Sequence, residues 1–243
     1  MLTSDEIKRY QRHIVLKNVG GAGQQKLKAA KVLVIGAGGL GSPVIAYLAA
    51  AGVGTIGVVD DDVVSLSNLQ RQILHRTQDQ GTTKVASAQR FTTDINEHIE
   101  FNAIEARLNA ENGADMIQPF DLIVDGSDNF DTRALVARLC EEARKPLVAG
   151  AVSLFDGNLT VFKPFEGENP RFRDLYPQRP SPDQLPSCEE AGILGPVTGV
   201  IGSLQAMEVV KLITQVGDPL VGRLLTYDGR DARMREIKYR RRS

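Results

Sequence analysis

Four glycines and an aspartate have the spacing of a nucleotide-binding turn. Gly36, Gly38, Gly39 and Gly41 directly follow the apolar run at residues 32–35. Glycines between a strand and a helix allow a tight turn whose backbone N–H groups face a phosphate. Asp60 follows Gly41 by 19 residues, where a carboxylate can accept hydrogen bonds from ribose hydroxyls. We therefore predict that this region binds a nucleotide.

The glycine motif alone does not say which nucleotide binds. NAD-dependent oxidoreductases and ATP-using enzymes both have such a turn, and a glycine turn can also be purely structural. The chain has no Gly-x-x-x-x-Gly-Lys-Ser/Thr sequence. A Walker-type phosphate loop is therefore excluded as the basis of ATP binding.

Basic and amide side chains beyond Asp60 favour phosphoryl chemistry. Arg71 and Lys84 could neutralise a triphosphate, whereas hydride transfer needs few fixed cations near the phosphates. Either residue taken alone could be an ordinary solvated surface cation. The polar run before Arg71 completes the predicted nucleotide-binding set: Ser67, Asn68, Leu69 and Gln70.

A second acidic motif, at residues 125–129, follows a short apolar run. Carboxylate oxygens are ligands for Mg²⁺, so Asp128 is our candidate metal ligand beside the phosphates. Asn129 could bond the nucleotide or simply cap the next helix. These residues predict a displacement at phosphorus that is assisted by Mg²⁺.

Apolar runs alternate with helical segments through the first 151 residues. This alternation predicts an α/β fold of Rossmann type, a mainly parallel sheet flanked by helices, with its ligand site at the carboxyl ends of the strands. A capping box at Thr3 and Glu6 predicts a first helix that runs through Ile14. The expected strands are 32–35, 55–59, 99–104, 122–124 and 146–151, and the expected helices are 40–51, 84–93 and 129–143.

Antiparallel strands are expected on the C-terminal side. Asp156-Gly157, between the apolar stretches 148–155 and 159–162, is typical of a β-hairpin turn. Residues 163–196 lack periodicity and predict a long functional loop. A final helix is expected at 197–216, with closing strands at 224–228 and 234–239. We expect one domain over residues 1–243.

Composition narrows the class of protein. The net charge of −1 gives no reason to expect a nucleic-acid or membrane partner. The N-terminal residues lack the pattern of a signal peptide, and no run reaches the ~18 apolar residues of a membrane span. Two cysteines cannot form a disulfide framework. These features lead us to expect a cytoplasmic protein.

Taken together, these motifs resemble the ubiquitin-activating-type HesA/MoeB/ThiF family over nearly the whole chain. The matching stretches are residues 9–12, 36–41, 60, 65–72, 84, 125–129 and 199–208. The resemblance implies that Gly39 and Asp60 contact ATP and that Asn68, Arg71 and Lys84 surround its phosphates. It also implies that Asp128 binds Mg²⁺ and that Arg12 reaches into the active site of the other subunit of a homodimer.

By this resemblance, the expected activity is adenylation of the C-terminal glycine of a ubiquitin-like sulfur carrier that ends in Gly-Gly. The carrier would be of the molybdopterin synthase small subunit type, and pyrophosphate would be released. A sulfurtransferase is a possible further partner. A thiamine-pathway carrier, an NAD-dependent oxidoreductase and a scaffold that has lost catalysis are the alternatives.

The chain departs from many members of this family at its cysteines. Two Cys-x-x-Cys pairs for a structural zinc are absent, so no zinc is expected. Cys188 matches a loop cysteine that some relatives use for thioester or persulfide chemistry, although Glu189 and Glu190 would raise its thiol pKa. Cys140 is expected in the core. No histidine is assigned to catalysis.

Overall fold

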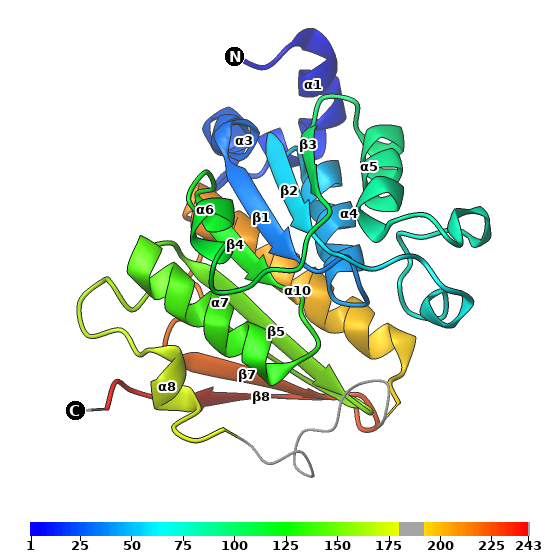
Figure 1. Ribbon diagram of the computed structural model, residues 1–243. Helices are drawn as coiled ribbons and strands as arrows, with labels where there is room; N and C mark the ends of the chain where they lie inside the picture. Colours follow the sequence, from blue (N-terminus) through cyan, green and yellow to red (C-terminus); the bar gives the residue numbers. More distant parts are fainter. Residues whose placement is uncertain (180–191, 243) are drawn as a thin grey trace.

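The computed structural model describes residues 1–179 and 192–242. Its elements, including two 3-10 helices η1 and η2, alternate as the sequence predicts (Figure 1). In chain order they are α1 (Ser4–Arg9), α2 (Gln11–Ile14), α3 (Gly20–Ala29), β1 (Lys31–Ile35), α4 (Gly41–Ala51), β2 (Thr55–Val59), η1 (Leu66–Asn68), η2 (Thr77–Asp79), α5 (Lys84–Ile95), β3 (Glu100–Ile104), α6 (Gly113–Ile117), β4 (Leu122–Asp125), α7 (Phe130–Ala143), β5 (Leu147–Ser153), β6 (Asp156–Phe162), α8 (Phe172–Leu175), α10 (Gly195–Thr214), β7 (Arg223–Asp228) and β8 (Arg233–Lys238).

One sheet of eight strands organises the described residues, in the order β3-β2-β1-β4-β5-β6-β7-β8. The first five strands in this order pair in parallel, and β6, β7 and β8 add antiparallel pairs. The predicted α/β fold class with antiparallel strands on the C-terminal side is confirmed. Because β1 lies between β2 and β4, the chain order reverses beside β1, which is where such sheets bind ligands.

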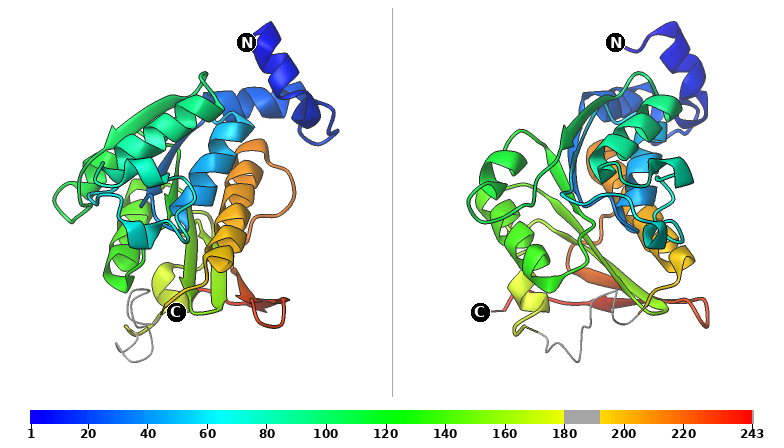
Figure 2. Two further views of the ribbon diagram at one scale, coloured as in Figure 1. Left: turned by 90° about the vertical axis from the view of Figure 1, so that its right-hand side faces the viewer. Right: turned by 45° about the vertical axis from the view of Figure 1, so that its right-hand side comes forward.

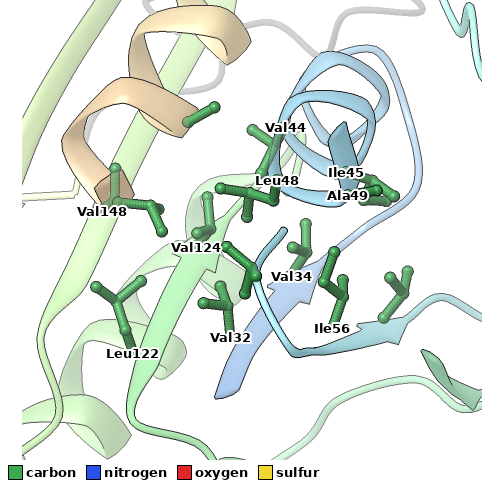
Figure 3. Close-up of a cluster of buried hydrophobic side chains, with 14 of the residues drawn as sticks. Val32, Val34, Val44, Ile45, Leu48, Ala49, Ile56, Leu122, Val124 and Val148 are labelled. Atoms are coloured by element: carbon green, nitrogen blue, oxygen red, sulfur yellow. The ribbon is translucent and has the colours of Figure 1, made fainter. Parts of the chain in front are cut away.

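Helices cover both faces of the sheet (Figure 2). Alternate residues of β1 enter different cores: Val32 and Val34 pack with α4, whereas Leu33 and Ile35 pack with α7. This two-sided burial explains why residues 32–35 of β1 are a continuous apolar run. Figure 3 shows the first of these cores, in which Val44 and Leu48 of α4 lie over the strands.

The long helix α10 belongs to the first core. By length and composition alone α10 could cross a membrane. However, it packs against α4, β5 and β6, and its residues Val197, Ile201 and Val209 are buried. Core packing therefore accounts for its apolar composition.

Local differences from the sequence predictions have physical causes. The first helix divides at Tyr10, whose buried ring contacts Gly52 and whose hydroxyl accepts a hydrogen bond from Asn96. The hairpin turn lies at Leu154 and Phe155, so its predicted position at Asp156-Gly157 is wrong; those two residues begin β6 and pair with β5. The predicted loop 163–196 contains α8 and the beginning of α10.

Close packing at Gly57 provides a test of the fold. A Cβ there would lie 2.3 Å from Cζ of Phe120 and 2.9 Å from Cδ1 of Leu33. We expect Gly57→Ala to lower the free energy of unfolding by about 1–3 kcal/mol through overpacking, as measured by urea denaturation. The control is Gly21→Ala, which adds a Cβ to a helix in open space and should leave stability equal or higher by up to about 1 kcal/mol. Unchanged stability of Gly57→Ala would contradict this account of the core.

Candidate active site

A pocket lies at the carboxyl ends of β1, β2 and β4, at the point where the chain order reverses. Its wall contains Gly36, Gly38 and Gly39 from the turn after β1. The sequence-predicted residues Asp60, Arg71, Lys84, Asp128 and Asn129 also line it. The topology therefore brings together residues that are up to 93 positions apart, from Gly36 to Asn129.

The glycine turn is held by close backbone contacts. Gly36 has φ +92°, in the left-handed region that favours glycine. A Cβ at Gly41 would lie within 1.9 Å of the Gly36 carbonyl oxygen. Gly41 therefore lets α4 begin immediately beside the turn. It shapes the turn and does not itself line the pocket.

Asp60, at the end of β2, binds the turn and a buried lysine. Its Oδ2 accepts a hydrogen bond from the Ala37 N–H at 2.8 Å, and its Oδ1 lies 3.9 Å from the Lys84 ammonium. Lys84 also pairs with Asp62 at 2.6 Å. Burial raises the pKa of the Asp60 carboxyl, while the charge of Lys84 and the backbone N–H groups of Ala37 and Asp62 act to lower it. The lysine is thus a buried cation whose charge is offset by carboxylates.

Arg71 is positioned by the turn that precedes it. Its guanidinium donates to the Ser67 carbonyl at 3.1 Å, and a Cβ at Gly195 would lie 2.4 Å from the Gln70 carbonyl oxygen. The start of α10 therefore packs directly against this segment. Among the described residues, no carboxylate forms an ion pair with Arg71. The positive charge of Arg71 is therefore available to an anionic ligand.

Asp128 and Asn129 stand exposed at the rim of the pocket, between β4 and α7. The Asn129 Oδ1 accepts from the Thr132 N–H at 2.9 Å, so Asn129 is the N-cap of α7. Asp128 accepts a hydrogen bond from Asn129 Nδ2 at 3.4 Å and has no cationic partner in the described part of the chain. Its oxygens are therefore free to bind a cation.

Several other predicted site residues lie outside the pocket wall. Asn68 accepts from the Ser65 N–H and caps η1, and Ser67, Leu69 and Gln70 belong to the same segment without lining the pocket. Arg12 is exposed on α2, which packs on α3 at the opposite end of the strands (Figure 1). Cys188 lies outside the described residues. Cys140 is buried on α7, as expected, and burial raises the pKa of its thiol.

The pocket also contains residues that the sequence predictions did not include. Gln72 is buried with an unpartnered Oε1, and the N-terminal turn of α10 adds Thr198. Arg107 and Arg133 are further cations in the wall, and the Arg133 guanidinium donates to the Ser127 carbonyl at 2.9 Å. Gln72 directly follows Arg71 in the polar run, so this run was the sequence feature that could have indicated Gln72 as a pocket residue. The other three come from segments that only the fold brings near the glycine turn.

Known proteins resemble this chain over nearly its full length. A sulfur carrier protein adenylyltransferase of Thermus thermophilus is 46% identical over 242 residues, which cover 98% of this chain and 89% of that protein. The adenylyltransferase and sulfurtransferase MOCS3 of Anopheles gambiae is 46% identical over 239 residues, but the chain spans only 54% of its length. A crystal structure of E. coli MccB with MccA-N7isoASN has the same fold, with a TM-score of 0.84, 22% identity, and coverage of 99% of this chain and 73% of that one.

A family model supports the same relationship. The ThiF family model matches residues 10–243, a span that contains the glycine turn, the segment around Arg71 and the acidic motif at Asp128. The chain belongs to the ThiF family.

Proposed function

We propose that this protein is an ATP-dependent adenylyltransferase that activates the C-terminal carboxylate of a sulfur-carrier protein. The observation that carries the proposal is the convergence of Arg71, Lys84 and Asp128 on the pocket beside the glycine turn. Two cations and a free carboxylate match the needs of a displacement at phosphorus. The Thermus and Anopheles relatives are named adenylyltransferases, which supports the same activity.

The proposed reaction needs no nucleophile from the protein. A carboxylate oxygen of the carrier's terminal glycine attacks the α-phosphorus of ATP, and the bond from that phosphorus to the bridging oxygen of pyrophosphate breaks. The products are an acyl-adenylate and pyrophosphate. The carboxylate is ionised at neutral pH, so the chain's own residues align the reactants and stabilise phosphate charge. Arg71 and Lys84 stabilise the charge of the phosphates, and Asp60 accepts hydrogen bonds from the ribose hydroxyls.

Asp128 is the residue best suited to hold Mg²⁺. Asp60 and Asp62 already face Lys84, whereas Asp128 has no cationic partner among the described residues. The ion supplies positive charge that offsets the phosphates. Asp60, Asp61 and Asp62 have ligand atoms within 4.8 Å of one another, but hydrogen bonds and the lysine engage two of them.

Further parts of the proposal concern assembly and partners. We infer a homodimer in which Arg12 acts in the site of the partner subunit, because in its own chain it is exposed and away from the pocket. A ubiquitin-like carrier with a Gly-Gly end is the expected substrate. A sulfurtransferase would then supply sulfur to the activated carrier, and the reactions would take place in the cytoplasm.

An NAD-dependent oxidoreductase is the competing function. Its hydride transfer needs an acid or base near the substrate, often histidine or tyrosine. The described residues that line the pocket include no histidine, tyrosine or cysteine. Adenylyl transfer is therefore the better match to this site.

Pyrophosphate exchange into ATP tests the activity and identifies the carrier. Candidate carriers ending in Gly-Gly are offered one at a time with labelled pyrophosphate. We expect exchange with a molybdopterin-synthase-type carrier and none with a carrier whose last glycine is deleted. Exchange with only a thiamine-type carrier would assign the other pathway. NAD binding without any ATP-dependent exchange would contradict the proposal.

Substitutions at the pocket test the roles of its charges. Arg71→Ala and Asp128→Ala should each lower the carrier-dependent exchange rate by at least about a hundredfold, because each removes stabilisation of phosphate charge. Circular dichroism and thermal unfolding should show an intact fold. Matched controls are Arg76→Ala and Asp94→Ala, which break an exposed ion pair outside this pocket. Near-normal exchange in either pocket variant would remove that residue from the mechanism.

The cysteine content predicts the metal content. This chain has two cysteines, so it cannot supply the four thiolates of a Cys₄ zinc site. We expect no stoichiometric zinc in protein that has been purified and washed with a chelator, as measured by atomic emission. One tightly held zinc per chain would show that other ligands replace the missing cysteines.

A further inference from the structure

His75 is a buried histidine to which the proposed mechanism gives no role. Its side chain lies between the glycine turn and α5, with Nε2 3.0 Å from the Ala37 carbonyl oxygen and Nδ1 2.9 Å from the Ser87 hydroxyl. Only 6% of the residue is exposed. Among the described residues, the imidazole is the side chain that forms a hydrogen bond with the Ala37 carbonyl.

The Ala37 contact fixes the position of one proton. A carbonyl oxygen can only accept a hydrogen bond, so the Nε2 atom must carry the hydrogen. If the ring is neutral, Nδ1 is then bare and needs a donor. The Ser87 hydroxyl is the donor within reach.

The Ser87 hydroxyl has a single hydrogen and two neighbouring acceptors. Its oxygen lies 2.9 Å from His75 Nδ1 and 2.8 Å from Asp79 Oδ2. Asp79 already accepts from the Arg76 N–H and from the Arg90 guanidinium. Asp79 keeps these two donors if the Ser87 hydroxyl turns from it to His75, whereas a bare Nδ1 has no other donor among the described residues.

Burial is the main factor that favours the neutral ring of His75. Burial lowers the pKa of His75 and the charge of Lys84 acts in the same direction, while the Ala37 carbonyl, Asp60 and Asp79 oppose them. Arg90 already neutralises Asp79. The neutral ring with its hydrogen on Nε2 satisfies the geometry without a buried charge.

The held carbonyl controls the direction of the next N–H group. The Ala37 carbonyl and the Gly38 N–H belong to one planar trans peptide unit, so they point in opposite directions. Gly38 lines the pocket, and its N–H has no hydrogen-bond partner among the described residues. On the preceding peptide unit, the Ala37 N–H is bound by Asp60.

We propose that His75 is the positioning residue of the nucleotide turn: its Nε2–H holds the Ala37 carbonyl so that the Gly38 N–H faces the phosphates, and Ser87 fixes the required tautomer. This inference rests on the proposed nucleotide site. It assigns no catalytic contact to the imidazole, which acts through the backbone.

Three substitutions at His75 distinguish positioning from filling space. His75→Ala should raise the KM for ATP about tenfold, because the Ala37 carbonyl loses its partner, and should leave the KM for the carrier within about twofold. His75→Gln places an amide near the Nε2 position and should recover most of the ATP affinity. The His75→Asn side chain has a similar polarity but reaches only toward Ser87, so this variant should not recover the ATP affinity. The exposed His98 provides the control, and His98→Ala should match the wild type.

The tautomer can be measured without activity. The chain has three histidines, His13, His75 and His98, and ¹⁵N spectra of the ring nitrogens of the free protein resolve them, with His75→Gln as the assignment variant. We expect His75 to show a protonated Nε2 and a bare Nδ1 at neutral pH. Ser87→Ala should weaken this preference.

The outcomes are separable. A His75 ring protonated at Nδ1, or equal ATP KM values in the Gln and Asn variants, would overturn the inference even if His75→Ala does not fold. An unchanged ATP KM in folded His75→Ala would do the same. Absence of ATP binding by the wild type would refute the proposed function instead, while the spectra would still decide the tautomer.

Discussion

The close approach of two backbone turns is the constraint on which the site depends. A Cβ at Gly36 would lie 3.1 Å from the Gly126 carbonyl oxygen, and a Cβ at Gly126 would lie 3.0 Å from the Ile35 carbonyl oxygen. The loops that follow β1 and β4 can meet at this distance because both positions lack side chains. The meeting places the glycine turn beside Asp128, and β2 contributes Asp60 on the other side. Every proposed contact to the nucleotide depends on this arrangement.

Charge is distributed unevenly around that meeting point. Lys84 is buried and shares two carboxylates, which reduces the cost of keeping an ammonium out of water. Arg71 is half-buried without an acidic partner among the described residues, so its charge remains for a ligand. The Asp60 carboxylate accepts a hydrogen bond from the glycine turn and lies beside Lys84. It is also the predicted contact for the ribose. The site therefore combines a rigid, internally neutralised part with a cation that is ready to bind phosphate.

The sequence was sufficient for the parts of the structure that depend on local patterns. Apolar runs predicted the parallel strands, and glycine and acidic motifs predicted one part of the pocket wall: Gly36, Gly38, Gly39, Asp60, Asp128 and Asn129. The sequence did not predict α3, because Gly20 and Gly21 begin it and tertiary burial of Gln24 and Leu27 stabilises it. It placed the hairpin turn two residues late, since Asp156-Gly157 has good turn propensity but pairs with β5. Arg133 and Thr198 line the pocket because of tertiary packing, which no local sequence pattern predicts.

The strand β8 ends one side of the sheet, and among the described residues no further strand pairs with its outer edge. Its outer backbone groups could pair with another chain. Its six residues, Arg-Met-Arg-Glu-Ile-Lys, are all exposed and include three basic side chains and one acidic side chain. A second β8 brought edge to edge would carry the same excess of positive charge, which opposes pairing. The composition of β8 thus protects a long sheet from aggregating through its free edge, and it disfavours β8 as the contact by which two copies of the chain would associate.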